Sequence, residues 1–189
     1  MRTPADRILV RAMDRLMTRR ILVCATLLFA LAPALTAQKP GWRQATDAEL
    51  AALLPARAPV EKEHIETEMR TASGITDGKG HFVAGVVLIT AGYSADGKYS
   101  HYMVVQSPLR VGGVRLSPGE YLLGWDRDHD KNRLNVRFSE AASGRVVATA
   151  EAHELTGRVG VASLRIWPPG DKTIIQIGRF GISYELGEE

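Results

Sequence analysis

The segment Phe82–Ala91, an uncharged run rich in β-branched residues, constrains the fold of this chain more than any other stretch of its sequence. Neither of its two alternating faces carries the polar residues that a water-exposed strand face needs. Such a run is typical of a strand buried on both sides. It is too short to cross a membrane as a helix, which takes about 20 apolar residues. We therefore expect it to be the central strand of a sheet that is covered on both faces.

Shorter segments with alternating apolar and polar residues follow this run at intervals of about ten residues. The alternation is clearest where Leu134, Val136 and Phe138 interleave with polar neighbours. The pattern predicts an all-β fold, an antiparallel β-sandwich of about eight or nine strands, with an up-and-down β-barrel as the alternative. The segments are 61–71, expected at a sheet edge, then 82–91, 99–106, 109–116, 121–125, 133–138, 146–153, 162–166 and 173–186, the last bent near Gly178.

Thr46 and Glu49 form a capping box, the sequence signature of a helix N-terminus. Apolar residues follow on one helical face, and Pro55 stops the turn. We expect a short helix here that covers a sheet edge or a barrel mouth. The chain then divides into a signal peptide at 1–37, a lead-in with the short helix at 38–58 and a single β-domain at 59–189.

The first 37 residues have the pattern of an export signal peptide, with basic residues, an apolar core at Ile21–Ala32 and small residues up to Ala37. That core is short for a membrane anchor. Thr18–Val23 resembles a twin-arginine signal, so the general secretory route and the twin-arginine route both stay open. Met17 is an alternative start to Met1. We expect a periplasmic or secreted bacterial protein.

Removing this segment changes the charge balance. Six of the 24 Lys and Arg and two of the 21 Asp and Glu lie in residues 1–37, so residues 38–189 carry 18 positive and 19 negative side chains, a net charge of −1. A nearly neutral chain gives no basic surface for nucleic acid, and no such partner is expected. The single cysteine, Cys24, lies within the signal, so we expect no disulfide and no thiolate chemistry after export.

The turn at Leu116–Tyr121 reads Leu-Ser-Pro-Gly-Glu-Tyr. This Leu-x-Pro-Gly-x-Tyr pattern resembles turns of Ig-like and transthyretin-like sandwiches, and the chain resembles uncharacterised small exported bacterial β-domains. The resemblance implies a sandwich. It implies no activity, cofactor or site residue.

Asp126, Asp128 and Asp130 are the best candidate for a site, because alternate aspartates begin a calcium-binding loop. The rest of the loop departs from that pattern. Lys131 stands where the loop needs glycine, and Arg137 stands where it needs a bidentate glutamate. We expect a solvated hairpin loop with no metal and no cofactor, and calcium binding by the three aspartates is the open alternative.

Other chemistry-bearing residues are scattered. The histidines lack the spacing of a zinc site, and no hydrolase nucleophile motif is present. His101 would lie on a strand beside tyrosines, either lining a pocket or as a hydrogen-bonded strand residue. Aromatic residues near loop tips either form a stacking platform for sugars or a partner's apolar patch, or pack into the core. The residues concerned are His64, His81, His101, His129, His153, Trp125, Trp167, Tyr93, Tyr99 and Tyr102.

These observations assign no catalytic residue and predict a non-catalytic binding or accessory module of the cell envelope, with a glycan or an envelope protein as its partner. One alternative is a small β-barrel that carries an apolar ligand, which a cavity of at least about 300 Å³ would favour. The other is a hydrolase whose catalytic residues meet only in the fold. A cleft joining His101 or His129 to a carboxylate and a hydroxyl would favour the hydrolase.

Overall fold

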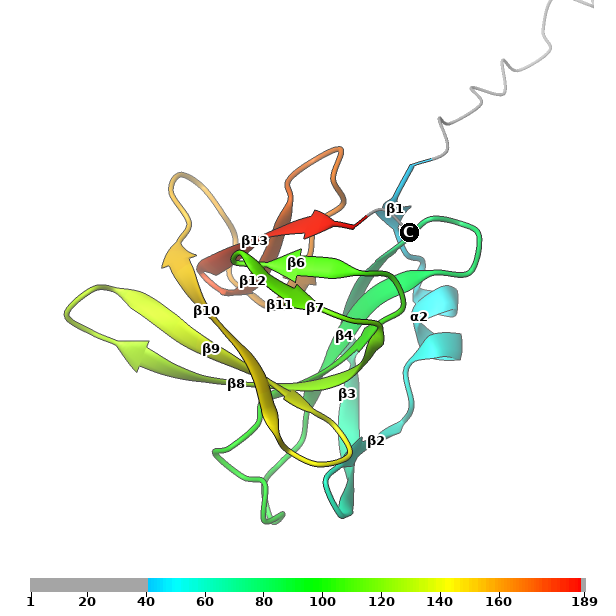
Figure 1. Ribbon diagram of the computed structural model, residues 1–189, viewed down its shortest axis with the longest axis vertical. Helices are drawn as coiled ribbons and strands as arrows, with labels where there is room; N and C mark the ends of the chain where they lie inside the picture. Colours follow the sequence, from blue (N-terminus) through cyan, green and yellow to red (C-terminus); the bar gives the residue numbers. More distant parts are fainter. Residues whose placement is uncertain (1–40, 188–189) are drawn as a thin grey trace, which may run out of the picture. The chain divides into compact units, whose positions relative to one another are not determined.

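The computed structural model describes residues 41–187, which fall within one compact unit. The signal peptide predicted at 1–37 lies outside the described residues. Within 41–187 the chain forms one helix and thirteen strands (Figure 1). These are β1 (Arg43–Gln44), α2 (Asp47–Leu53), β2 (Arg57–Val60), β3 (Glu63–Thr76), β4 (Phe82–Leu88), β5 (His101–Val105), β6 (Leu109–Val111), β7 (Val114–Leu116), β8 (Gly119–Asp128), β9 (Arg133–Glu140), β10 (Val146–Glu154), β11 (Ala162–Ile166), β12 (Ile174–Gly178) and β13 (Phe180–Leu186).

The thirteen strands pair antiparallel in one sheet that curls into half a barrel (Figure 1). Its main path is β1-β3-β4-β5-β8-β9-β10-β13-β12-β11, with β2 paired to β3 and the β6–β7 hairpin paired to β13. The all-β antiparallel class with a short N-terminal helix is confirmed. One continuous sheet, however, replaces the two sheets of a sandwich. The strands outnumber the expected eight or nine because β1 and β2 were not foreseen and because two segments counted as one strand each form hairpins. At 109–116 the Gly112–Gly113 interruption predicts a small hairpin or a bulged strand, and the structure has the hairpin; the second hairpin is at 173–186.

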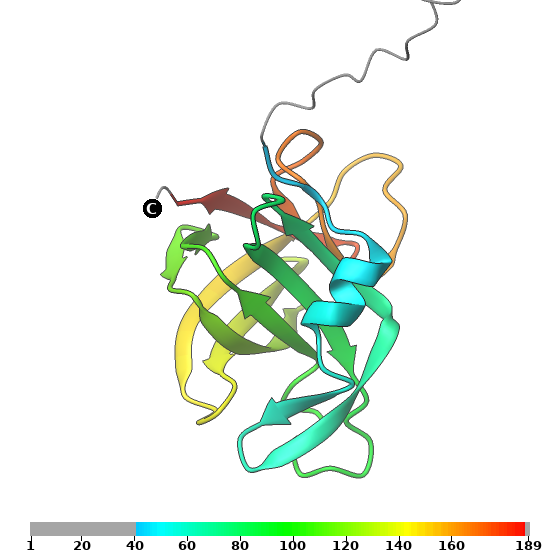
Figure 2. The ribbon, with the colours of Figure 1, turned by 90° about the vertical axis from the view of Figure 1, so that its right-hand side faces the viewer.

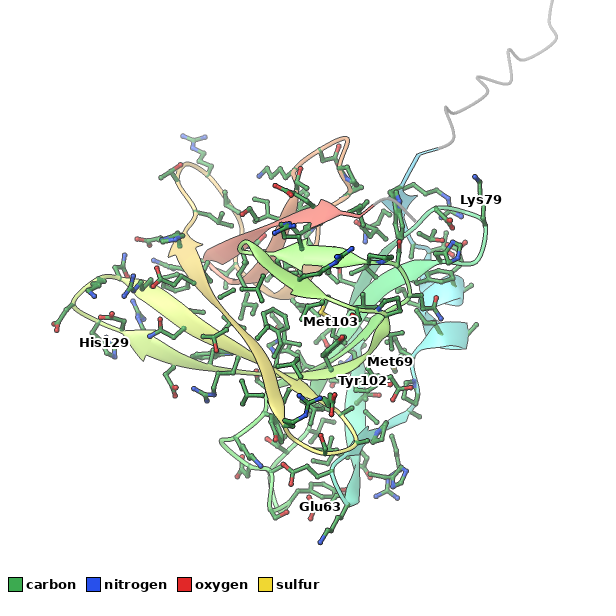
Figure 3. The ribbon with its side chains drawn as sticks, viewed as in Figure 1. Glu63, Met69, Lys79, Tyr102, Met103 and His129 are labelled. Atoms are coloured by element: carbon green, nitrogen blue, oxygen red, sulfur yellow. The ribbon has the colours of Figure 1, made fainter. Side chains whose placement is uncertain are left out.

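Strand β4 lies between β3 and β5, and both of its faces are buried, as the sequence predicts. Val83 belongs to the inner core, the apolar cluster that the curled sheet encloses. Ala84 and Val86 belong to the outer cluster on the opposite face. On β5, Met103 belongs to the inner core and its neighbour Tyr102 to the outer cluster (Figure 3). The two faces of the central strands therefore serve two separate cores.

The elements that cover the outer face of β4 are not those we expected. We expected later strands to cover both faces of β4, but α2 lies across the outer face of β3 and β4 (Figure 2). Leu50 and Leu54 of this helical segment are buried in the outer cluster, together with Ala58 and Val60 of β2. The described part of the lead-in, residues 41–58, thus supplies β1, α2 and the start of β2, and its apolar side chains help to complete the outer cluster.

The predicted helix N-terminus is confirmed in detail. Thr46 is the N-cap, its hydroxyl accepts a hydrogen bond from the Glu49 amide at 3.3 Å, and the Glu49 carboxylate accepts one from the Thr46 amide at 2.8 Å. Arg43 donates two further hydrogen bonds to that carboxylate, at 2.9 and 2.7 Å. The helix ends at Leu53, before Pro55. Its N-terminus is therefore fixed to the start of the sheet, where β1 pairs with β3.

Two strand predictions need correction. The segment at 61–71 is not at a sheet edge, because β3 pairs with β4 on one side and with β1 and β2 on the other. The change of face near Gly178 is a two-residue hairpin turn, in which Ile177 pairs with Phe180 and Gly178 has φ 63°. The turn after Leu116 is closed by Tyr121, whose hydroxyl donates to the Ser117 carbonyl at 2.6 Å.

The last strand of the main path, β11, packs against β3 and β4 but does not pair with them. We call this junction the seam. Leu164 of β11 lies on Gly85 of β4, where a Cβ atom would come within 2.9 Å of the leucine Cδ2 atom. The Ile166 amide donates to the Ser73 hydroxyl of β3 at 2.9 Å. Close packing and side-chain hydrogen bonds therefore join the two ends of the curled sheet.

The Gly85→Ala substitution tests the packing at the seam. Its methyl group would collide with Leu164 and would lie 3.1 Å from the Tyr102 carbonyl oxygen. Overpacking of this kind lowers the free energy of unfolding by about 1–3 kcal/mol. The matched control is Gly170→Ala, because a Cβ atom there meets nothing within 4 Å. Urea unfolding measures both variants, and equal stabilities would contradict the proposed contact.

Candidate functional site

A cleft of about 720 Å³ opens at one end of the curled sheet. We call it the mouth cleft. Its walls come from the end of β4, the loop at 89–100, the first residue of β5, β8, the start of β9, the start of β11 and the β12–β13 turn. The side chains that carry the argument below are His101, Trp125, Arg127, Val161, Arg179 and Phe180. The cleft continues the inner core outward, since the inward-facing residues of several strands line it.

Along the inner face of β8, the side chains change from buried to exposed where the strand enters the cleft. Leu123 is buried in the inner core. Two residues further on, Trp125 is 41% exposed, and Arg127 follows at the rim. On the β11 side, Val161 is 71% exposed. A large aromatic and an aliphatic side chain thus present apolar surface to the cleft that the protein itself does not cover.

The polar groups in the wall are already hydrogen-bonded within the protein. His101 is 4% exposed, and its Nε2 lies 3.1 Å from the Ser163 carbonyl oxygen of β11. A carbonyl oxygen can only accept, so Nε2 carries the proton. Nδ1 lies 2.8 Å from the Ser100 hydroxyl, whose single proton is shared between Nδ1 and the Leu123 carbonyl oxygen at 3.1 Å. Burial lowers the pKa of His101 to about 4, against a smaller opposing effect of the bond to Ser163. The neutral ring therefore links β11 to β5, beside the seam.

The Ser100–His101 contact does not have the features of a catalytic pair. Both ring nitrogens are occupied, one by a backbone carbonyl where a triad has a carboxylate. A general base works best with a pKa near the operating pH, and burial places that of His101 far lower. The cleft thus joins His101 to a hydroxyl but not to an orienting carboxylate.

Three cationic side chains line the cleft, and they differ in whether a carboxylate of the protein pairs with them. Lys98 forms an ion pair with Glu61. Arg179 lies 3.6 Å from Glu154. Arg127 stacks over the Phe180 ring with its Cζ atom 5.5 Å from the ring centroid, and among the described residues its guanidinium forms no ion pair.

The candidate calcium ligands lie on the β8–β9 hairpin but do not converge. Asp126 forms an ion pair with Arg137, the residue at the expected glutamate position. Asp128 accepts from the Lys131 amide at 3.1 Å and lies 3.3 Å from Arg133. No group of three acidic, histidine or cysteine side chains that could hold a metal ion occurs in residues 41–187. The hairpin is thus a charge-paired, solvated element.

The remaining candidates do not come together at one site. His64, His129 and His153 are exposed on separate strands or turns, with His129 at the tip of the β8–β9 hairpin (Figure 3). His81 bonds to Asp77 at 2.7 Å. The tyrosines Tyr93, Tyr99 and Tyr102 pack in the outer cluster and form no exposed platform. Trp167 packs between Arg165 and Lys172, whose charged groups lie 3.6 and 4.6 Å from its ring centroid.

Sequence reasoning selected His101 and Trp125 but not the cleft between them. Val161 was missed because nothing local in the sequence shows that β11 folds back over β4. Arg127 was missed because the strand was expected to end at Trp125, which left Arg127 in the following loop. The usable signal was the order Leu123, Trp125, Arg127 at alternate positions, which places them on one strand face.

Comparisons of the chain with protein-family models, with curated proteins and with solved structures give no match. The described part of the chain contains no helix long and apolar enough to span a membrane.

The buried His101 predicts a specific pH dependence of stability. Its folded pKa of about 4 lies below the ordinary value of 6.5, so the unfolded chain takes up a proton that the native state resists. Stability is therefore lost as the pH falls from 6.5 toward 4. At pH 5 the loss relative to pH 7 is about 2 kcal/mol from this residue.

The His101→Gln variant isolates this effect, because a glutamine amide can still donate to the Ser163 carbonyl but does not titrate. We expect the difference in free energy of unfolding between pH 7 and pH 5 to shrink by about 2 kcal/mol in the variant. Urea unfolding at both pH values measures it. Parallel pH dependences of the two proteins would show that the imidazole is not buried in its neutral form.

Proposed function

We propose that the protein is an exported, non-catalytic binding module of the cell envelope that holds a small apolar ligand in the mouth cleft. The observation that carries the proposal is the exposed apolar surface of Trp125 and Val161 above a floor of inner-core side chains. A cleft of about 720 Å³ lies in the size range of small-molecule sites. The export step rests on the signal pattern of residues 1–37.

An apolar ligand suits this cleft better than a glycan. A sugar presents many hydroxyl groups, each of which needs a partner when it leaves water. The polar wall groups of His101 and Ser100 already bond within the protein. Thr90 and Asp96 also bond to each other, at 3.2 Å. Groups that could form hydrogen bonds with a ligand therefore remain chiefly at the rim. The interior of the cleft favours an apolar group of the ligand.

A binding role also suits the chemistry of the wall better than hydrolysis. His101 is the one histidine that lines the cleft, and its pKa of about 4 makes it a weak base at neutral pH. Its ring links β5 to β11, so its position is explained by the fold. The glycan or protein partner expected for an envelope module remains an alternative occupant of the exposed rim.

Thermal unfolding of the protein with decan-1-ol, an uncharged apolar probe, tests the proposal. A ligand that binds only the native state stabilises it in proportion to RT ln(1 + [L]/Kd), so we expect the melting temperature to rise with probe concentration. We expect no rise with a soluble oligosaccharide such as chitotetraose. The opposite pattern would replace the apolar ligand by a glycan.

The Trp125→Ala variant connects the effect to the cleft. Removal of the aromatic wall should weaken decan-1-ol binding by about 1 kcal/mol, because the alkyl chain then buries less apolar surface. Val146→Ala is the matched control, because Val146 is an exposed apolar residue of β10 that does not line the cleft. Equal binding by the parent protein and Trp125→Ala would place the ligand elsewhere.

A further inference from the structure

We propose that the ligand of the mouth cleft is an amphipathic anion, with its apolar body against Trp125 and its acidic group at the rim beside Arg127. This inference rests on the proposed function and adds the chemical class of the ligand. Its basis is the charge arrangement on the two faces of the β8–β9 hairpin.

The arginines on one face of this hairpin form ion pairs within the protein, whereas the arginine on the other face forms none with the residues that the structure describes. Arg133 lies 3.3 Å from Asp128 and 2.6 Å from Glu151. Arg137 pairs with Asp126. These arginines of β9 are therefore matched by carboxylates within the protein. Arg127 is not: its Nη2 donates at 3.2 Å to the neutral amide oxygen of Asn132.

The guanidinium of Arg127 is held in place although it is not neutralised. Phe180 supports one face of it at the β12–β13 turn. Asn132, which accepts its hydrogen bond, has φ 46° and donates in turn to the Glu154 carboxylate. A guanidinium has five N–H donors, and the bond to Asn132 uses one of them. The remaining donors are available to a planar carboxylate, which an arginine can bind through two parallel hydrogen bonds.

Among residues 41–187, Glu154 is the one carboxylate that contacts the group formed by Arg127, Asn132 and Arg179. It lies 3.6 Å from Arg179, the second arginine that lines the cleft, and accepts from Asn132. The network of two arginines, one asparagine and one glutamate therefore has a net charge of +1. Asp96, the acidic side chain of the lining, lies on the 89–100 loop and accepts from Thr90. Lys98 is matched by Glu61. Together with Asp96 the groups named here sum to zero, so the positive charge is confined to the side of the cleft that carries Arg127 and Arg179.

The order of groups along β8 matches the order of groups in such a ligand. From the core outward, the inner face presents the aliphatic Leu123, the aromatic Trp125 and the cationic Arg127. A ligand with an apolar body and a terminal acid group can bury the first part against the cleft floor and leave the acid at the water-exposed rim. Its charge then avoids the desolvation that a deeper position would require.

The test compares decanoate with decan-1-ol, two probes that share the alkyl chain and differ in the charged group. Isothermal titration calorimetry of the protein should show decanoate binding about tenfold more tightly, as a charge-assisted hydrogen bond predicts. The preference should fall as salt is raised, because the arginine is exposed to solvent.

Two variants should move this preference in opposite directions. Arg127→Gln removes the cation, and decanoate should then bind no better than decan-1-ol. Glu154→Gln removes the competing carboxylate while an amide oxygen can still accept from Asn132, so decanoate should bind more tightly than to the parent protein. Arg115→Gln, an exposed arginine of β7 away from the cleft, is the control and should leave both affinities unchanged.

The outcomes separate the two proposals. If both probes bind equally and neither Arg127→Gln nor Glu154→Gln alters their ratio, the ligand class is wrong while the apolar cleft stands. If neither probe binds the parent protein, the proposed function itself is overturned. Should Arg127→Gln fail to fold, the Glu154→Gln result decides alone, because tighter decanoate binding supports the inference and an unchanged affinity refutes it.

Discussion

Burial of both faces of β4 is the constraint on which the rest of this structure depends. A sheet with such a strand must be covered twice, and the chain achieves this in two different ways. On the inner side the sheet curls on itself until β11 lies over β4. On the outer side α2 and β2, which precede β3, complete a second apolar cluster. The close approach at Gly85 is possible because glycine leaves room for Leu164.

Incomplete closure of the sheet follows from this arrangement and creates the mouth cleft. Because β11 joins β3 and β4 by packing and a side-chain hydrogen bond, the strands described in residues 41–187 form no backbone ladder between these two ends of the curled sheet. The bond from His101 to Ser163 links β11 to β5 beside this junction. The residue that best resembles a catalytic group is thus occupied in holding the sheet together. Its low pKa is a consequence of that structural position.

The fold class and the local signals were predictable because they depend on short-range patterns. The β4 run, the Thr46–Glu49 capping box and the antiparallel all-β pattern all appear in the structure. Closure was not predictable, because alternation shows that a strand has an inner face but not which strand lies opposite. For the same reason the cleft could not be predicted from the sequence. Trp125 and Val161 are separated by 36 positions in the sequence, and only the return of β11 brings them to one cavity.

For the ligand proposed above, selectivity would follow from which polar groups of the mouth cleft the protein leaves available. A wall with unused donors and acceptors would accept many hydroxylated ligands, since each could exchange water for protein hydrogen bonds. Here the imidazole, the nearby hydroxyls and Lys98 are already engaged within the protein. A polar group placed deep in the cleft would therefore lose its water without replacement. The rim differs, because Arg127 is positioned by Asn132 and Phe180 yet keeps its charge. Discrimination among ligands would thus rest on exclusion in the interior and on a single preorganised charge at the entrance.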